Sequence, residues 1–299
     1  MNALLYFLVV VIWGTTWVAI AMQQGVVSVP VSIFWRFAIA SSLLLISLKL
    51  LGRLKTLAFK DHLFCVLQGA CVFGFNFFCF YYASFWINTG LESVIFSMAV
   101  LFNTFNSFVF FARKPSRRIF PSALLGISGV VALFWHELSG QTFSQPMLYG
   151  ILLSALGTFG FSLGNMISLR HQSHKLDLFT TNGYAMLYGT LIMGAIALAR
   201  GDNFVPEATL RYLGSLLYLA IFGSVIAFSA YFSLVRRIGA NKAAYSTLLF
   251  PPVALLLSTL YEGYVWHLNA GIGIVLILAG NLVMFYQPAQ RVKRPVQQA

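Results

Sequence analysis

The sequence predicts an all-α membrane protein in which ten transmembrane helices form two inverted five-helix repeats. Of its 299 residues, 59% are hydrophobic and only 9% are charged, and the mean hydropathy is +0.83. A soluble domain carries about 25% charged residues, so this chain cannot cover a water-exposed surface of its size. The apolar residues instead fall into ten runs, each close to the about 20 residues that cross a bilayer core.

A duplication is the second observation behind this fold class. The pair Phe73-Gly74 recurs as Phe222-Gly223 at an offset of 149 residues. The same offset relates five further identities: Leu67 with Leu216, Tyr82 with Tyr231, Ser84 with Ser233, Gly90 with Gly239 and Ser97 with Ser246. We expect residues 1–140 to form the first repeat and residues 141–299 the second, with a short basic tail. Because five is odd, the second repeat enters the membrane from the opposite face, an arrangement typical of transporters.

The ten expected spans follow one another through loops too short for an extramembrane domain. They are Ala3–Ala21, Val31–Leu51, His62–Trp86, Leu91–Phe111, Ile119–Trp135, Met147–Leu169, Thr180–Ala199, Tyr212–Leu234, Lys242–Leu260 and Ala270–Phe285. The first has no preceding Lys or Arg and no cleavage pattern of small residues, so we interpret it as a retained helix and not a signal peptide. Short linkers make tight hairpins of segments three and four and of segments eight and nine.

The distribution of positive charge predicts the orientation. Sixteen of the 19 Lys and Arg residues fall on the side of the N-terminus, whereas only Arg200 and Arg211 fall on the other side. Cytoplasmic loops carry such an excess, so both termini are expected in the cytoplasm of a multi-pass protein of the cell (inner) membrane. One span more or fewer would destroy this bias. We therefore interpret the net charge of +12 as a topology signal, and we expect no nucleic-acid partner.

Arg36 is the basic residue that lies well within an expected span. A charge at the bilayer centre costs about 2.5–3.5 kcal/mol on insertion scales. Its side chain either reaches the outer interface, pairs with an outer acid such as Glu92, or lines the outer vestibule and attracts anionic groups. Glu92 opens segment four, where the helix macrodipole favours an acid. The middles of the other spans carry no Asp, Glu, Lys or His, which disfavours tight ion coupling through a buried carboxylate.

Aromatic residues make up 16% of the chain, and some fall beside polar ones at membrane depth. Trp13 and Thr16 lie in segment one, and segment three carries Asn76 inside an aromatic run that ends at Tyr82. Asn76 needs a hydrogen-bond partner at that depth, which a neighbouring helix and a substrate could supply equally well. Together these four residues predict an amphipathic pocket for apolar or aromatic solutes.

Prolines and cysteines occur at positions that bear on helix shape. Pro251 and Pro252 fall in the middle of segment nine, and their missing N–H groups predict a kink there. The pair is a candidate hinge, although simple packing geometry explains it as well. The cysteines Cys65, Cys71 and Cys79 share one apolar segment without metal-ligand spacing, so we interpret them as packing residues.

Several motifs occur in a characteristic order. They are Trp13-Gly14-Thr15-Thr16-Trp17, Trp35-Arg36-Phe37, the stretch from Tyr231 through Gly239 to Ala243-Ala244, the proline of segment nine, Glu262-Gly263 and a glycine-rich last segment. Over nearly the whole chain this order resembles the drug/metabolite transporter superfamily, specifically the EamA-type ten-helix permeases. The resemblance implies export or exchange of small metabolites, amino acids or amphiphiles. The chain departs from the family pattern at Phe102-Asn103, where a proline is usual, and at Ala112-Arg113-Lys114, where an acid is usual. A kink in segment four is therefore not assumed.

The leading hypothesis is a secondary transporter, either an exporter or a facilitator. It would carry small organic metabolites, such as amino acids or amphiphilic and aromatic solutes, by alternating access around a central cavity. The expected substrate contacts are Trp13, Thr16, Asn76, Tyr82, Ser97, Gly160, Tyr231 and Ser246, with Arg36 at the outer mouth. The alternative is a transporter of phosphorylated solutes such as sugar phosphates or nucleotide-sugars. That function needs a deep basic pocket, and beyond Arg36 only Lys242, at an inner rim, is available.

An enzyme is not expected, because no nucleophile–base pair or metal-ligand set occurs at membrane depth. His171 and His174 lie in a cytoplasmic loop with only Asp177 as a carboxylate nearby, which is a poor metal site. We predict no catalytic residue, no metal and no cofactor. Short loops disfavour a scaffold or receptor. The expected partners are a small-molecule substrate and the lipid bilayer, and the chain is expected to be a monomer or a homodimer.

Overall fold

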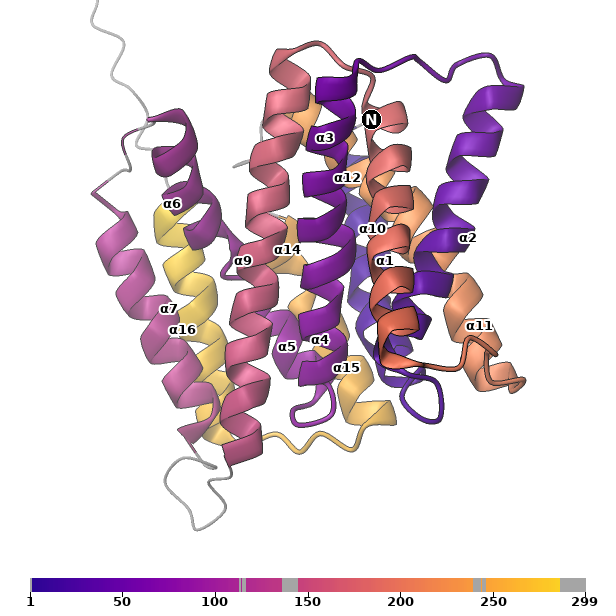
Figure 1. The fold of residues 1–299 in the computed structure, drawn as a ribbon. Coiled ribbons are helices and arrows are strands. Elements are labelled where there is room, and N and C mark those ends of the chain that lie inside the picture. The colour runs from indigo at the N-terminus through magenta and orange to yellow at the C-terminus, as the bar shows by residue number, and fades with distance from the viewer. Residues whose placement is uncertain are drawn as a thin grey trace, which may run out of the picture.

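The computed structural model describes residues 2–112, 114, 117–135, 145–238, 243 and 246–285, and all regular secondary structure among them is helical. The helices stand side by side in a bundle (Figure 1). The expected repeat boundary at residues 140 and 141, the start of the ninth span at Lys242 and the basic tail all lie outside the described residues.

The helical elements follow the order of the predicted spans. In the first half they are α1 (Asn2–Ala21), α2 (Val29–Leu50), α3 (Phe59–Gln68), η1 (Gly69–Asn76), α4 (Phe77–Ala83), α5 (Thr89–Phe96), α6 (Ala99–Phe111) and α7 (Ile119–Leu133). In the second half they are α9 (Gln145–Ser173), α10 (Leu178–Arg200), α11 (Leu210–Tyr218), η2 (Leu219–Ile226), α12 (Ala227–Ile238), α14 (Ser246–Leu249), α15 (Pro251–Tyr261) and α16 (Leu268–Phe285).

Seven of the described helical rods are long and apolar enough to cross a membrane. They are Asn2–Ala21, Val29–Leu50, Phe59–Ala83, Thr89–Phe111, Gln145–Ser173, Leu178–Arg200 and Leu210–Ile238. The other three predicted spans correspond to shorter apolar helices, Ile119–Leu133, Pro251–Tyr261 and Leu268–Val283. Large apolar side chains are exposed on many of these helices, which suits contact with lipid tails. The protein is thus a multi-pass membrane protein, while the count of ten spans and the orientation of the termini stay predictions.

Two π-helical segments interrupt corresponding rods of the two halves. One, η1, joins α3 to α4, and the other, η2, joins α11 to α12; their first residues, Gly69 and Leu219, are 150 positions apart. They contain the recurring pairs Phe73-Gly74 and Phe222-Gly223. Their packing is reciprocal, because η1 contacts α9 and α10 of the second half and η2 contacts α1 and α2 of the first. Turns of π-helix are rare in proteins as a whole, and those that occur are frequently found at functional sites. Their equivalent positions in the two halves therefore make the junction of the halves a candidate functional site.

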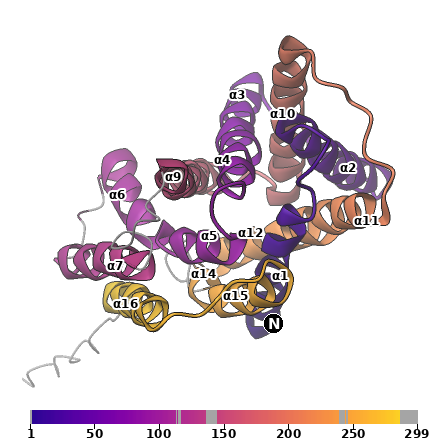
Figure 2. The ribbon, with the colours of Figure 1, turned by 90° about the horizontal axis from the view of Figure 1, so that it is seen from below.

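Glycines bring several of these helices close together. A Cβ on Gly69 would lie 2.4 Å from the carbonyl oxygen of Ala185, so η1 and α10 pack backbone against backbone. A Cβ on Gly129 would likewise lie 2.8 Å from the carbonyl oxygen of Gly273, between α7 and α16. Small residues at such contacts are the usual means of helix association in lipid. Figures 1 and 2 show α6, α7 and α16 at one end of the bundle and α2, α10 and α11 at the other.

Two of the predicted spans are broken. Segment four divides into α5 and α6 at Ser97 and Met98 without any proline. There the hydroxyls of Ser93 and Ser97 donate to carbonyl oxygens three residues earlier, at 2.5 and 2.6 Å, and such bonds compete with the helix ladder. Segment nine breaks at Phe250, and Pro251 begins α15, a position where its missing N–H costs no helical bond. The structure therefore has a helix break where the sequence predicts a kink, and the role of the proline pair as a hinge stays a prediction.

Candidate functional site

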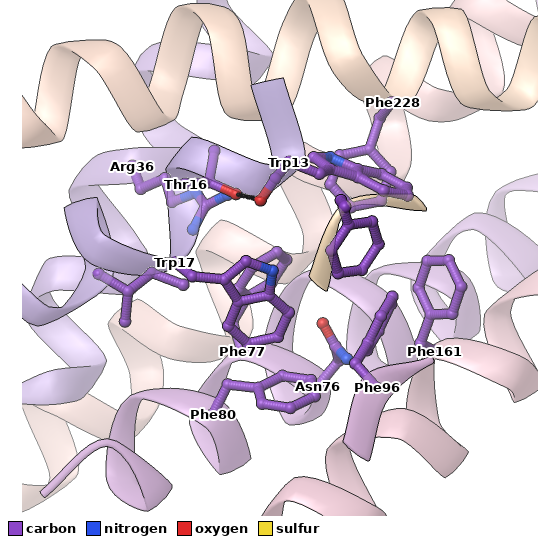
Figure 3. Close-up of a pocket in the computed structure, with 12 residues that line it drawn as sticks. Trp13, Thr16, Trp17, Arg36, Asn76, Phe77, Phe80, Phe96, Phe161 and Phe228 are labelled. Carbon is purple, nitrogen blue, oxygen red and sulfur yellow. Dashed lines mark hydrogen bonds between the residues drawn. The ribbon is translucent and has the colours of Figure 1, made fainter. Parts of the chain in front are cut away.

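A small cavity lies at the junction of the two halves (Figure 3). Eight of its twelve lining residues are aromatic: the lining is Trp13, Thr16, Trp17, Ile20, Arg36, Asn76, Phe77, Phe80, Phe96, Phe161, Phe228 and Phe250. Its volume is about 40 Å³. A water molecule needs about 10–15 Å³ and a ligand pocket usually has about 300–1,000 Å³, so this cavity could hold a few water molecules but no drug-sized ligand.

Trp13 on α1 is at the centre of the aromatic packing around the cavity. Its ring centroid lies 6.0 Å from that of Phe161, 5.1 Å from that of Phe228 and 5.0 Å from that of Tyr231. Its indole Nε1–H donates to the carbonyl oxygen of Gly223 in η2 at 3.4 Å. Inclined aromatic pairs of this kind add stability beyond the area they bury. Trp13 of the first half therefore contacts four aromatic side chains and a backbone carbonyl of the second half.

Asn76 and Thr16 supply neutral polar groups to the lining. Asn76 is the last residue of η1, and its Nδ2–H donates to the carbonyl oxygen of Gly157 on α9 at 2.8 Å. The helix–helix bond considered from the sequence is thus present, and the same side chain borders the cavity. The Thr16 hydroxyl donates to the carbonyl oxygen of Trp13 in its own helix at 2.9 Å, as the dashed line in Figure 3 shows.

Arg36 is the cation of this lining, and its side chain is only 1% exposed. Its Nε–H donates to Ser224 Oγ at 3.1 Å, and its guanidinium carbon lies 4.1 Å from the ring centroid of Phe77. Among the described residues, its Nη1 has no hydrogen-bond partner and no carboxylate forms an ion pair with it. Arg36 therefore neither reaches an interface nor pairs with Glu92. Its buried Nη1 is left without a partner beside an aromatic cavity.

The predicted contacts in the second half lie behind or beside the lining. Tyr231 is fully buried, packs on Trp13 and accepts a hydrogen bond from Asn165 Nδ2 at 3.4 Å. Ser246 donates to the carbonyl oxygen of Ala243 at 2.8 Å. Neither residue borders the cavity in this conformation, so their contact with substrate stays a prediction.

The remaining predicted contacts belong to helix packing in this structure. Tyr82 is half-buried against Phe78, with ring centroids 4.7 Å apart. Ser97 accepts a hydrogen bond from Asn281 Nδ2 of α16 at 3.4 Å. A Cβ on Gly160 would lie 2.8 Å from a ring carbon of a phenylalanine in η1, so this glycine permits close contact between α9 and η1. These three positions also lie outside the lining.

Most of the aromatic lining was not identifiable from the sequence. Trp17, Ile20 and Phe80 carried a signal, because each follows a predicted contact by four residues and shares its helix face. The others were not distinguishable in a chain with 29 phenylalanines. They are Phe77, Phe96, Phe161, Phe228 and Phe250.

The comparison with known proteins is consistent with this architecture. The model of the EamA-like transporter family matches residues 1–135 and 148–286. Protein PagO of Salmonella typhimurium is 24% identical over 280 residues, covering 93% of this chain and 90% of its own. The uncharacterized transporter YoaV of Bacillus subtilis is 23% identical over 274 residues, covering 91% and 92%.

Two further similarities concern location and fold. The uncharacterized inner membrane transporter YedA of Escherichia coli is 25% identical over 217 residues, covering 71% of this chain and 68% of its own. One solved crystal structure, 16% identical, has a TM-score of 0.68 and covers 94% of this chain and 95% of its own, which shows a shared fold. Because the family model matches nearly the entire length, the chain belongs to the EamA-like transporter family.

Proposed function

We propose that this protein is a secondary transporter of small organic solutes that combine an apolar or aromatic body with a carboxylate, amino acids among them. The observation that carries this proposal is the buried, partly unpartnered guanidinium of Arg36 in an otherwise aromatic cavity. Family membership supports a small-molecule transporter, and the lining supports the chemistry of its cargo.

The chemistry of the lining favours a carboxylate. Arg36 uses its Nε–H on Ser224 and keeps Nη1 for an incoming anion. A charge-assisted hydrogen bond in a water-excluded site contributes about 1.5–3 kcal/mol, and the planar guanidinium fork matches a carboxylate. The rings of Trp13 and Trp17 would accept an aromatic body by stacking, and their faces attract an ammonium group.

Phosphorylated solutes are the second candidate and fit this cavity less well. A phosphate carries nearly two negative charges and is usually held by several cations. Among the described residues, Arg36 is the one Lys or Arg in the lining, and Lys242, at the predicted inner rim, lies outside them.

We propose alternating access as the mechanism because both halves form the cavity, which is too small for an organic solute. Binding and release then require the halves to move apart. The break at Phe250 and Pro251 is well placed for such a movement, because Phe250 itself borders the cavity. In this proposal the halves are inverted repeats in the inner membrane with cytoplasmic termini, and Pro251 and Pro252 act as the hinge.

Exchange across liposome membranes tests this function. The purified protein would be reconstituted with 5 mM unlabelled solute inside, and uptake of radiolabelled phenylalanine would be measured. Unlabelled phenylalanine and 3-phenylpropionate should drive uptake when placed inside the liposomes and inhibit it when added outside. Phenethylamine should have either effect at least tenfold less strongly. Glucose 6-phosphate should not compete. Inhibition by glucose 6-phosphate alone would favour the phosphorylated class, and equal inhibition by phenethylamine would refute recognition of a carboxylate.

A further inference from the structure

We propose that Glu92 binds a proton at the junction of α5 and α15 and thereby couples the opening of this junction to pH. The proposal rests on the transport function proposed above and names its coupling ion. Glu92 is 0% exposed, and neither of its carboxyl oxygens has a hydrogen-bond partner among the described residues. An isolated buried carboxylate is among the most costly groups that a protein can hold, and binding a proton removes its charge.

The N-terminus of α5 is already occupied by a different acid. Glu262, at the end of α15, accepts the Thr89 backbone N–H at Oε1, 3.1 Å away, and the Thr89 hydroxyl at Oε2, 2.6 Å away. An acid in the first turn of a helix ordinarily benefits from the macrodipole and from free N–H groups. Glu262 takes that role here, so the sequence-based explanation for Glu92 does not apply to its side chain.

Among the described residues, no cation forms an ion pair with Glu92. Helix α5 packs against α1, α9 and α15, and within the described chain Glu262 is the charged group that acts on Glu92. Among other titratable groups, Tyr264 packs in the same apolar cluster as residues of α5, and Tyr149 on α9 is half-exposed. Two carboxylates at one helix end repel each other, and low local polarity strengthens the repulsion.

The position of Glu92 links its charge to the cavity. It lies one helical turn from Phe96, on the same face of α5, and Phe96 borders the cavity. Across the junction, a Cβ on Gly90 would lie 2.8 Å from the Cβ of Ser258, so α5 of the first half and α15 of the second are in tight contact. A proton on Glu92 removes the repulsion from Glu262 and lets this contact close and reopen during transport. As pH rises and the proton leaves, repulsion from Glu262 holds the two helices apart, so the halves complete the transport cycle only while Glu92 is neutral.

Carbodiimide labelling tests proton binding without any transport. Dicyclohexylcarbodiimide modifies protonated carboxyl groups in apolar surroundings, and peptide mass spectrometry locates the adduct. In the wild-type protein in liposomes, Glu92 should be labelled at least fivefold more than Glu262 and Glu207 at pH 6.5, and its labelling should fall as pH rises. An unlabelled Glu92 across pH 5.5–8 would overturn the proposal.

Glu92→Gln, which keeps the size and removes the titration, tests the coupling. With equal pH on both sides, the variant should exchange phenylalanine within twofold of wild type. A pH gradient should drive accumulation of phenylalanine in wild type and in the control Glu207→Gln, but not in Glu92→Gln. Phenylalanine stays zwitterionic between about pH 5 and 7, so the effect does not come from its own titration.

The possible outcomes separate the two proposals. Gradient-driven accumulation that persists in Glu92→Gln would overturn proton coupling, as would loss of exchange in a variant that still elutes as a folded protein. Wild-type protein that exchanges none of the tested solutes contradicts the proposed function instead, and the labelling of Glu92 then still decides whether it binds a proton.

Discussion

Replacing Arg36 by Met should weaken carboxylate binding without weakening the fold. The substitution keeps the length of the side chain and removes the donor that we assign to the carboxylate. Loss of one charge-assisted hydrogen bond of about 1.5–3 kcal/mol raises the half-saturating concentration of phenylalanine by about 10- to 150-fold. The half-saturating concentration of phenethylamine, which lacks the carboxylate, should rise less than threefold.

Stability should respond differently to the same substitution. Met forfeits the bond to Ser224 at 3.1 Å and the contact with the Phe77 ring at 4.1 Å. It also removes a desolvated charge with no counterion in the described structure, and apolar replacements of buried ions are often neutral or stabilising by about 1–4 kcal/mol. Thermal unfolding in detergent should therefore show a melting temperature at or above that of wild type.

These two measurements separate a recognition role from a structural one. Exchange kinetics of phenylalanine and phenethylamine would be compared for wild type, Arg36→Met and Arg36→Lys. Lys keeps the charge but lacks the planar guanidinium, so the half-saturating concentration of phenylalanine for Arg36→Lys should lie between those of wild type and Arg36→Met. An unchanged half-saturating concentration for phenylalanine in Arg36→Met would refute our reasoning. An equal increase in the half-saturating concentrations of phenylalanine and phenethylamine would refute it as well.

Three further predictions concern the cavity, the packing and the break in segment nine. Trp13→Ala should reduce phenylalanine exchange at least tenfold at normal membrane expression. The control Trp86→Ala, whose side chain is outside the lining, should not reduce it. Normal exchange by Trp13→Ala would exclude Trp13 as a substrate contact. Gly69→Ala should lower the free energy of unfolding in detergent by about 1–3 kcal/mol, because the added methyl group overlaps α10. The control Gly214→Ala, with open space around it, should be neutral or slightly stabilising. Equal melting temperatures of the two variants would contradict the close packing of Gly69. Pro251→Ala should slow exchange several-fold while changing stability by less than about 1 kcal/mol, and an unchanged rate argues against a hinge.

Much of the fold was predictable because hydropathy is a local property of the chain. The second expected span, Val31–Leu51, matches α2, and the sixth, Met147–Leu169, lies within the longer α9. The family was predictable as well, because its motifs are short and ordered along the sequence. The break between α5 and α6 was not predictable. It depends on serine hydroxyls that donate to backbone carbonyls of their own helix, and a serine in a helix does so only in some surroundings.

The candidate site was only partly predictable. Trp13, Thr16, Arg36 and Asn76 were identified because polar or deep amphipathic side chains stand out in an apolar span, and all four border the cavity. Tyr82 and Tyr231 occupy equivalent positions in the duplicated sequence, yet only Tyr231 packs on Trp13. The identity of the residues at a repeated position therefore did not determine what each one contacts.

The sequence by itself determined that this chain lies in lipid and that it resembles one transporter family, and seven identities at one offset predicted a duplication. Only the tertiary structure decided which phenylalanines converge on the cavity, that Arg36 is buried with an unpartnered Nη1, and that Glu262 instead of Glu92 caps α5. The physical reason is that lipid tails and a helix interface are both apolar. A helix in a membrane therefore carries little amphipathic signal to separate its inner face from its outer one, and contacts between distant helices settle which side chains meet.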